Sequence, residues 1–353
     1  MKARARPTGI RAASAALAAI ALLAAFPAMS AGGDKPRSIP EAPRAPYVTQ
    51  APIVMLKDLD SGKILFARGA DKRFAPASMT KVMTAYVVLD LIKRGQLSRD
   101  TLFTVDEATW KKWTARSRSS SMFLRSGEKL TVDELLKGLI TVSGNDAAAV
   151  LAVGIDGSED AFAKRMNAVA SRIGMSSSHF GTPSGWPDGG VTKVSAADLI
   201  LLADRLIRDH PAGYSRYFSI PKLQHGTAPD GKPIVQANRN PILGRFVGAD
   251  GLKTGHTSEA GYCFLGSAKR DGRRLIMVVA GLPSEKARRD EAERLMTWGF
   301  APSAAAAAGQ AARSGGPRAG KPRRRLDDKA RRGGYRRMMH RRQFLFGIDG
   351  RAA

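Results

Sequence analysis

Short apolar stretches near both ends of the chain have the length and turn boundaries of β-strands, whereas apolar residues in the middle recur at helical spacing. The strand-like stretches are 53–66, which contains its own turn, 261–268 and 274–280. The helical stretches are 76–95, several segments between 101 and 210, and 285–300. Sheet elements on both sides of a helical insert predict an α+β fold, with an antiparallel sheet flanked by helices and a mainly helical second lobe. We expect the functional site in the cleft between the lobes.

Local signals mark where two of the helices begin. Pro76-Ala-Ser78 precedes apolar residues at helical spacing. Thr131 and Glu134 have the spacing of a capping box ahead of another apolar stretch. We therefore expect Ser78 in the first turn of a helix, where unpaired backbone N–H groups and the helix dipole favour a developing negative charge.

The first 31 residues have the pattern of a secretory signal. A basic segment is followed by the apolar run 15–26 and by small residues that end at Ala31. The run is short for a bilayer span, so we expect a cleaved signal at 1–31, with a retained N-terminal anchor as the alternative. Export would place the protein in the periplasm or on the cell-wall side of the cytoplasmic membrane. A linker at 32–47 and a main domain at 48–300 are expected to follow.

Positive charge is concentrated at the C-terminal end. The formal net charge is +26, and residues 301–353 contain fourteen Lys and Arg against three Asp. Such a segment has little to bury and repels itself, so we expect a disordered tail that binds anionic wall or lipid surfaces. Nucleic acid is not expected as a partner, because an exported protein rarely meets it and the tail lacks interleaved aromatic residues for base stacking.

Cysteine and histidine are too sparse to indicate a disulfide framework or a metal site. Cys263 is the single cysteine and lies in an apolar run, so we expect a small buried hydrophobic residue rather than a nucleophile. The five histidines show no close pairing with one another or with the cysteine. We therefore expect no metal and no cofactor.

Three short motifs in a fixed order supply the groups of a serine acyl-transfer site. They are Ser78-Met-Thr-Lys81, Ser143-Gly-Asn145 and Lys253-Thr-Gly255. Each alone is weak, because Ser-x-x-Lys also occurs at ordinary helix N-termini. Together they provide a nucleophile, a lysine one helical turn away, a second hydroxyl with an amide, and a second cation beside a glycine. That set suits nucleophilic catalysis in which no histidine serves as the base.

Ser78 is the candidate nucleophile and Lys81 its candidate base. Three residues apart on one helix, they share a face, so the lysine amine can approach the serine oxygen. A free lysine has a pKa of about 10.4 and would be protonated. Burial and the nearby cation Lys253 are expected to lower the pKa of Lys81 toward about 7–8, which suits a general base.

The other two motifs are expected to support this chemistry. Ser143 would relay a proton to the leaving amine, bridging Lys81 and Lys253, and Asn145 would bind the substrate carbonyl and help to hold Lys81. We expect Ser143 and Asn145 on a loop facing the cleft, with a plain helix N-cap as the alternative. On the third motif, Thr254 offers a hydroxyl to a carboxylate-ended substrate, and Gly255 leaves room for strand-like docking.

These motifs and their flanks resemble those of a known enzyme family. The three together are similar to those of the penicillin-recognising serine enzymes. The flanks Gly251–Thr257 and Ala260–Cys263 look like those of the low-molecular-mass D-alanyl-D-alanine carboxypeptidases, which are penicillin-binding proteins of the bacterial cell wall. The resemblance extends from about Pro52 to Phe300. It implies a β-lactamase/transpeptidase-like fold and a D,D-peptidase catalytic domain at 48–300.

The resemblance also implies a substrate and further site residues. The terminal D-alanine of a peptidoglycan stem pentapeptide would be removed through an acyl-enzyme on Ser78, with β-lactams as covalent inhibitors. The backbone N–H groups of Ser78 and His256 would form the oxyanion hole. Arg239 and Arg288 match family positions that suit a terminal carboxylate, since the planar fork of arginine bonds both oxygens. For each arginine the alternative is a solvated surface charge.

The chain departs from the family pattern in two places. Ser184 stands where relatives often carry histidine, which puts specificity near that loop in doubt. The basic tail stands where many relatives carry a β-rich second domain and a C-terminal amphipathic helix.

Three other functions stay open from the sequence. A D,D-endopeptidase that cuts peptidoglycan cross-links would use the same site. A class A β-lactamase is less consistent, because no Glu-x-x-x-Asn loop lies between Asn145 and Lys253 to direct a deacylating water. The basic tail also permits a polyanion-binding module with vestigial catalysis.

Overall fold

The computed structural model describes residues 45–116 and 119–302. The signal peptide expected at 1–31, most of the linker expected at 32–47, and nearly all of the tail expected at 301–353 lie outside the described residues. Within the described part, no helix combines the length and the hydropathy needed to cross a membrane.

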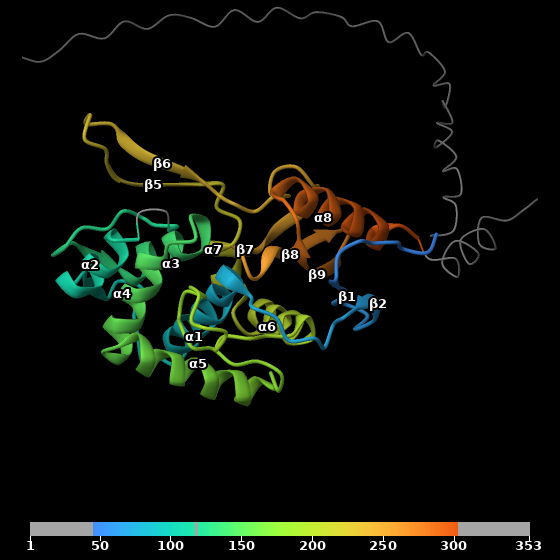
Figure 1. The fold of residues 1–353 in the computed structure, drawn as a ribbon, viewed down its shortest axis with the longest axis horizontal. Helices are drawn as coiled ribbons and strands as arrows, with labels where there is room; N and C mark the ends of the chain where they lie inside the picture. The colour runs from blue at the N-terminus through green and yellow to red at the C-terminus, as the bar shows by residue number, and fades with distance from the viewer. Residues whose placement is uncertain (1–44, 117–118, 303–353) are drawn as a thin grey trace, which may run out of the picture. The chain divides into compact units, whose positions relative to one another are not determined.

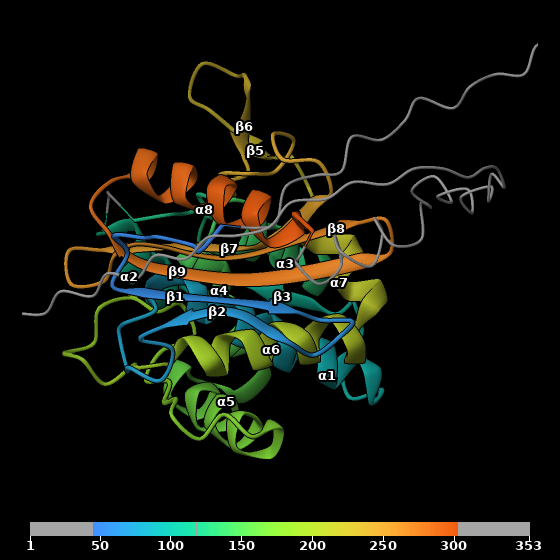
Figure 2. The same cartoon turned by 90° about the vertical axis from the view of Figure 1, so that its right-hand side faces the viewer.

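A five-stranded antiparallel sheet forms the centre of the described part, with the strand order β2-β1-β9-β8-β7 (Figures 1 and 2). The strands are β1 (Ile53–Asp58), β2 (Ile64–Arg68), β7 (Ala249–Thr257), β8 (Gly261–Arg270) and β9 (Arg273–Leu282). The hairpin predicted at 53–66 and the strands predicted at 261–268 and 274–280 are confirmed. β7 forms one edge of the sheet, so within residues 45–116 and 119–302 one side of this strand has no neighbouring strand.

Both faces of the sheet are buried, which explains why the central strand β9 is apolar at every position from Leu275 to Ala280. In β9, Ile276 and Val278 belong to the core shared with the helical lobe, whereas Met277 and Val279 pack in a second core with helix α8 (Glu285–Phe300). Successive side chains point to opposite faces of a strand, so a sheet covered on both sides needs apolar residues at every position. Figure 2 shows α8 on one face and α6 (Ala196–Asp209) on the other.

The helical lobe accounts for the middle of the chain, as predicted. Its other helices are α1 (Lys81–Lys93), α2 (Glu107–Thr114), α3 (Val132–Thr141), α4 (Asn145–Asp156), α5 (Glu159–Ile173) and α7 (Pro211–Tyr217). Two two-stranded antiparallel sheets accompany them: β3 (Leu102–Thr104) pairs with β4 (Lys129–Thr131), and β5 (Lys222–Thr227) pairs with β6 (Pro233–Ala237). The predicted capping box is confirmed, because Thr131 and Glu134 each accept the other's backbone N–H at the start of α3.

The predicted start of the first helix is wrong by a few residues. Residues Ala77–Thr80 form a short 3₁₀ turn, η1, and α1 begins only at Lys81. Ala77 has a φ of +48°, in the left-handed region, so one continuous α-helix cannot run through it. Ser78 therefore lies in a separate turn ahead of α1.

Candidate active site

A cleft of about 950 Å³ runs beside β7. Lys81 and Lys253 lie beneath its surface, with 0% and 2% of each residue exposed. The lining includes residues from all three motifs and both candidate arginines: Ser78, Ser143, Asn145, Thr254, Gly255, His256, Arg239 and Arg288. The fold thus brings together every residue that the sequence analysis assigned to one site.

The amine of Lys81 contacts three oxygen atoms, two of which can only accept hydrogen bonds. Lys81 Nζ lies 2.7 Å from Asn145 Oδ1, 2.7 Å from the backbone carbonyl oxygen of Ser184 and 3.0 Å from Ser78 Oγ. A neutral amine has two N–H groups and one lone pair. Donation to the two carbonyl oxygens therefore leaves the lone pair for the Ser78 hydroxyl. In that state Lys81 is placed to accept the proton of Ser78.

The pKa of Lys81 is lowered to about 7, chiefly by burial and further by the positive charge of Arg239, whereas the carboxylate of Asp146 opposes the shift. The direction predicted from the sequence is confirmed, but the expected cation was Lys253. Lys253 is itself buried, and its own pKa is lowered first by burial and then by the charges of Lys81, Arg239 and Arg288. The field at Lys81 therefore comes from the arginine, which keeps its charge.

Two glycines let the Ser78 turn approach its neighbours closely. A Cβ atom at Gly255 would lie 2.4 Å from the backbone oxygen of Pro76, and one at Gly185 would lie 1.9 Å from the backbone oxygen of Ala77. Contacts that short do not occur, so both positions must lack a side chain. The sequence analysis expected Gly255 to make room for substrate; the structure shows that it makes room for η1.

Asn145 and Ser143 lie at the junction before α4. Asn145 is the first residue of that helix and not part of a loop, which corrects the sequence-based prediction, and the N-cap position belongs to Gly144. The Asn145 side-chain oxygen accepts from Lys81, so its amide NH₂ group remains for a substrate carbonyl. Ser143 has a φ of +63° and is 2% exposed. No hydrogen bond joins its hydroxyl to either lysine in the described part, so its relay role stays a prediction.

The third motif lies on β7. Lys253 and Thr254 are buried, and Lys253 Nζ donates to the backbone oxygen of Thr254 at 3.1 Å. His256 is exposed at the cleft and stacks on Tyr262, with 3.9 Å between the ring centres. Its imidazole is therefore held flat against a neighbouring strand.

The two candidate arginines differ in their surroundings. Arg239 is exposed on the cleft wall and donates to the hydroxyl of Ser120. Arg288, on α8, is only 6% exposed, its Nε–H has no acceptor among the described residues, and the nearest carboxylate, Glu285, is 3.8 Å away. The surface-charge alternative is therefore wrong for Arg288. An incompletely paired guanidinium in a cleft suits a carboxylate ligand.

Two supporting residues escaped the sequence analysis. Ser120 accepts from the Asn145 backbone N–H at 2.8 Å and also receives the hydrogen bond of Arg239. Asp146 is 5% exposed and binds the loop at 121–124 through the backbone N–H groups of Met122 and Leu124 and the hydroxyl of Ser121. An acidic residue in the first turn of a helix is common, so nothing in the local sequence marked Asp146 as an anchor.

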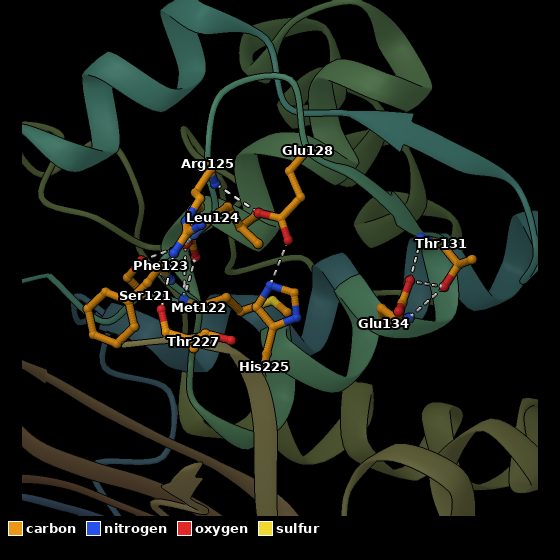
Figure 3. A network of polar contacts seen from close by, with 11 residues as sticks. Ser121, Met122, Phe123, Leu124, Arg125, Glu128, Thr131, Glu134, His225 and Thr227 are labelled. Carbon is orange, nitrogen blue, oxygen red and sulfur yellow. Dashed lines mark hydrogen bonds and ion pairs between the residues drawn. The ribbon is translucent and has the colours of Figure 1, made fainter. Parts of the chain in front are cut away.

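The β5–β6 hairpin contacts the continuation of this loop at Arg125 and Glu128, as Figure 3 shows. Glu128 Oε1 lies 3.1 Å from His225 Nε2, and Arg125 donates to the backbone oxygen of Thr227 at 3.1 Å. Asp146 therefore supports, through one loop, both the cleft wall and the hairpin above it.

Other chemistries find little support within residues 45–116 and 119–302. No group of three or more His, Cys, Asp or Glu side chains that could hold a metal ion is found there. Cys263 is fully buried, and burial raises the pKa of its thiol to about 11, so it is an inert core residue as predicted.

Comparison with known proteins identifies a family match and several similar proteins. Residues 40–284 match the family model described as D-alanyl-D-alanine carboxypeptidase. The chain is 37% identical to the D-alanyl-D-alanine carboxypeptidase DacA of Haemophilus influenzae over 80% of this chain and 70% of the relative. It is also 37% identical to DacA of Escherichia coli K12 over 73% of this chain, and it spans 62% of that relative.

Solved structures show the same fold. Penicillin-binding protein 5 of Haemophilus influenzae has a TM-score of 0.67 and 38% identity over 73% of this chain and 72% of its own. Penicillin-binding protein D2 of Listeria monocytogenes, solved in an ampicillin-bound form, has a TM-score of 0.60 and 32% identity over 72% of this chain and 100% of its own. The predicted α+β, β-lactamase/transpeptidase-like fold is confirmed.

An added carbon at Gly255 is expected to push β7 away from the Ser78 turn. We expect Gly255→Ala to lower the free energy of unfolding by about 2 kcal/mol, and hence Tm by about 4–8 °C. Acylation by a fluorescent penicillin should slow by about tenfold or more, because Ser78 moves relative to the cleft. Calorimetry and gel fluorescence measure the two effects.

The control is Gly231→Ala, in the turn between β5 and β6, where an added carbon meets no atom within 4 Å but the φ of +81° is strained for alanine, so stability is lost away from the cleft. Its acylation rate is expected to stay within about twofold of the wild-type rate. If penicillin acylates Gly255→Ala at the wild-type rate, the close contact of η1 with β7 is not needed for acylation.

Proposed function

The chain belongs to the D-alanyl-D-alanine carboxypeptidase family, and on that basis we propose that it is a serine D,D-carboxypeptidase. It would remove the terminal D-alanine from peptidoglycan stem pentapeptides through an acyl-enzyme on Ser78. The observation that carries the proposal is the contact of Lys81 Nζ with Ser78 Oγ, Asn145 Oδ1 and the Ser184 carbonyl. This contact supplies an activated nucleophile without histidine.

The first half of the reaction is acyl transfer to the serine. Neutral Lys81 accepts the Ser78 proton while Ser78 Oγ attacks the carbonyl carbon between the last two D-alanines. The oxyanion would be stabilised by the backbone N–H groups of Ser78 in η1 and His256 in β7, two elements that pack closely at Gly255. Collapse of the tetrahedral intermediate breaks the C–N bond, and the leaving amine takes up the proton, with Ser143 as the proposed relay.

The second half is hydrolysis of the ester on Ser78. Water attacks the acyl carbon, and Lys81 again serves as the base for its proton. The acid product leaves and the Ser78 hydroxyl is restored.

The positive groups of the cleft suit a substrate that ends in a carboxylate. Thr254 on β7, Arg288 on α8 and Arg239 line the cleft, and Lys253 is buried next to Thr254 on β7. We propose that these groups hold the carboxylate of the leaving D-alanine. The amide of Asn145 then binds a carbonyl of the acyl-donor part.

β-Lactams are proposed to acylate the same serine and to leave slowly. The similar protein from Listeria monocytogenes has been solved in ampicillin-bound and cefotaxime-bound forms. The one acidic side chain that lines the cleft within the described residues is Glu285, on α8 after the third motif. That position does not match the deacylating glutamate of class A β-lactamases, which supports the peptidase over a lactamase.

We also retain two proposals that rest on sequence. The signal pattern at 1–31 supports action in the periplasm or on the cell-wall side of the cytoplasmic membrane. The basic residues of 301–353 support binding to anionic wall or lipid surfaces.

Ser78→Ala provides the test of the proposed activity. The mature protein is expected to release D-alanine from a D-Ala-D-Ala pentapeptide, and Ser78→Ala to lose this release and the covalent mark left by penicillin. Amino-acid analysis and mass spectrometry of the intact protein measure the two results. D-Alanine release undiminished in Ser78→Ala would refute the assignment. Equal or faster cleavage of cross-linked muropeptides would favour the endopeptidase alternative.

The pKa of Lys81 predicts how acylation depends on pH. Because the base must be uncharged, the rate should rise as pH increases through about 7, and should fall below that value as Lys81 becomes protonated. Lys81→Arg keeps a positive charge that cannot be lost and should reduce acylation by about 10³-fold or more at every pH. Stopped-flow acylation from about pH 5.5 to 9 checks both, and an inflection near the ordinary lysine value would contradict the buried-base assignment.

Removing the basic tail tests its proposed partner. A chain that ends at Phe300 is expected to lose binding to anionic phosphatidylglycerol vesicles at low salt, while its acylation rate by penicillin stays unchanged. Vesicle co-sedimentation of both chains measures this, and equal binding by the two chains would contradict the tail proposal.

A further inference from the structure

Arg116 is held between two indole rings beside the cleft. Its guanidinium carbon lies 4.7 Å from the ring centre of Trp113 and 5.1 Å from that of Trp186. The two rings meet edge to face, with 5.6 Å between their centres. Trp113 comes from α2, and Trp186 follows the residues that contact Lys81 and the Ser78 turn. Cation–π contacts with two aromatic faces hold a guanidinium in position and leave its N–H groups free.

The guanidinium of Arg116 has no anionic partner among residues 45–116 and 119–302, and its side chain makes no hydrogen bond there. Other arginines of the helical lobe are paired: Arg165 with Asp156, and Arg216 with Asp133. A fixed guanidinium whose fork is unpaired has the geometry that binds a carboxylate through two parallel hydrogen bonds.

A second cavity, of about 240 Å³, adjoins the cleft at this point. Trp113 and Arg116 line the cavity, Trp186 lines the cleft, and Ser119 lines both, so the guanidinium and the two rings border the two spaces. Trp113 is 4% exposed, and its indole Nε1–H has no acceptor in the described part of the chain.

The charges around the cavity favour an anion. Its charged lining consists of Arg116, Arg125 and Asp146. The carboxylate of Asp146 already accepts from the hydroxyl of Ser121 and from backbone N–H groups, including that of Met122. It is therefore satisfied within the protein and does not pair with either arginine.

We propose that Arg116, held by cation–π contacts with Trp113 and Trp186, forms a specificity subsite for a carboxylate on the acyl-donor part of the substrate. The preferred substrate is a peptide with a free carboxylate N-terminal to its D-alanyl-D-alanine end. The cations suited to the terminal carboxylate come from β7, α8 and the segment before β7, whereas Arg116 belongs to the helical lobe, which leaves it for the other side of the scissile bond. This inference rests on the proposed function.

Two matched peptides test the subsite. They are Nα-acetyl-α-aminoadipyl-D-Ala-D-Ala, whose side chain ends in a carboxylate, and the same peptide with a carboxamide there. The ratio of their kcat/KM values isolates the charge, because the reacting bond is identical. A hydrogen-bonded ion pair with a fixed arginine predicts a ratio of about 10 or more in the wild-type protein.

Arg116→Gln is expected to reduce this ratio to about 1, because the charge is lost. The matched control is Arg205→Gln, which removes one positive charge from α6, where Arg205 pairs with Asp209 away from the cleft. Its ratio is expected to equal that of the wild-type protein. The melting temperature and the penicillin acylation rate of each variant show whether its fold and Ser78 are intact. The ratio for the wild-type protein tests the subsite even if a variant fails to fold.

The outcomes separate this inference from the function on which it rests. Release of D-alanine from both peptides at equal kcat/KM by the wild-type protein would overturn the subsite and leave the carboxypeptidase assignment standing. A wild-type ratio that persists in Arg116→Gln would likewise overturn it. If neither peptide is cleaved, the proposed function fails. The subsite is then tested by how strongly each peptide slows the acylation of Ser78 by penicillin, and equal protection by the two peptides would overturn it.

Discussion

Lys81 is fully buried at the start of α1, where its amine meets two carbonyl oxygens and one hydroxyl. Burial of an ammonium group is costly, and a protein reduces that cost by lowering the pKa of the group. The neutral amine donates its two N–H groups to the two carbonyl oxygens, so its lone pair is directed toward the Ser78 hydroxyl. The reactivity proposed for Ser78 thus depends on a desolvated amine and on two acceptors that come from α4 and from the segment before Trp186.

That arrangement requires several distant segments to meet within contact distance. The turn that carries Ser78 packs against β7 on one side and against the segment of Gly185 on the other, and both contacts leave no room for a Cβ atom. The sheet supplies a rigid base, because both of its faces are buried. The helical lobe supplies Asn145 from the first turn of α4, where Asp146 fastens the neighbouring loop. Catalytic geometry here depends on tertiary packing more than on any one motif.

Much of this was predictable, because local patterns encode it. The hairpin at 53–66, the helix at 285–300 and the capping box of α3 depend on spacing within one segment. The three motifs also predicted which residues meet at the cleft. The 3₁₀ turn at Ser78 was not predictable, because the left-handed φ of Ala77 depends on contacts with distant residues.

Other features escaped prediction for the same physical reason. Nothing in the sequence indicated the contacts made by Ser120 or Arg116, because they depend on which segments the fold brings together. For the same reason, the cation that lowers the pKa of Lys81 is Arg239 and not Lys253 as expected. Gly255 was identified correctly but for a different reason, since its neighbour is the backbone of Pro76, a residue far away in the sequence.

The left-handed backbone of Ala77 and Ser143 has an evolutionary consequence. Each carries a Cβ atom in a conformation that glycine adopts freely, and each such residue costs on the order of 1–3 kcal/mol. The cleft is therefore less stable than the same fold would be with relaxed loops. Selection for heat resistance alone would favour relaxing these two positions and would disturb the reactive geometry, so durability and turnover are opposed at this site.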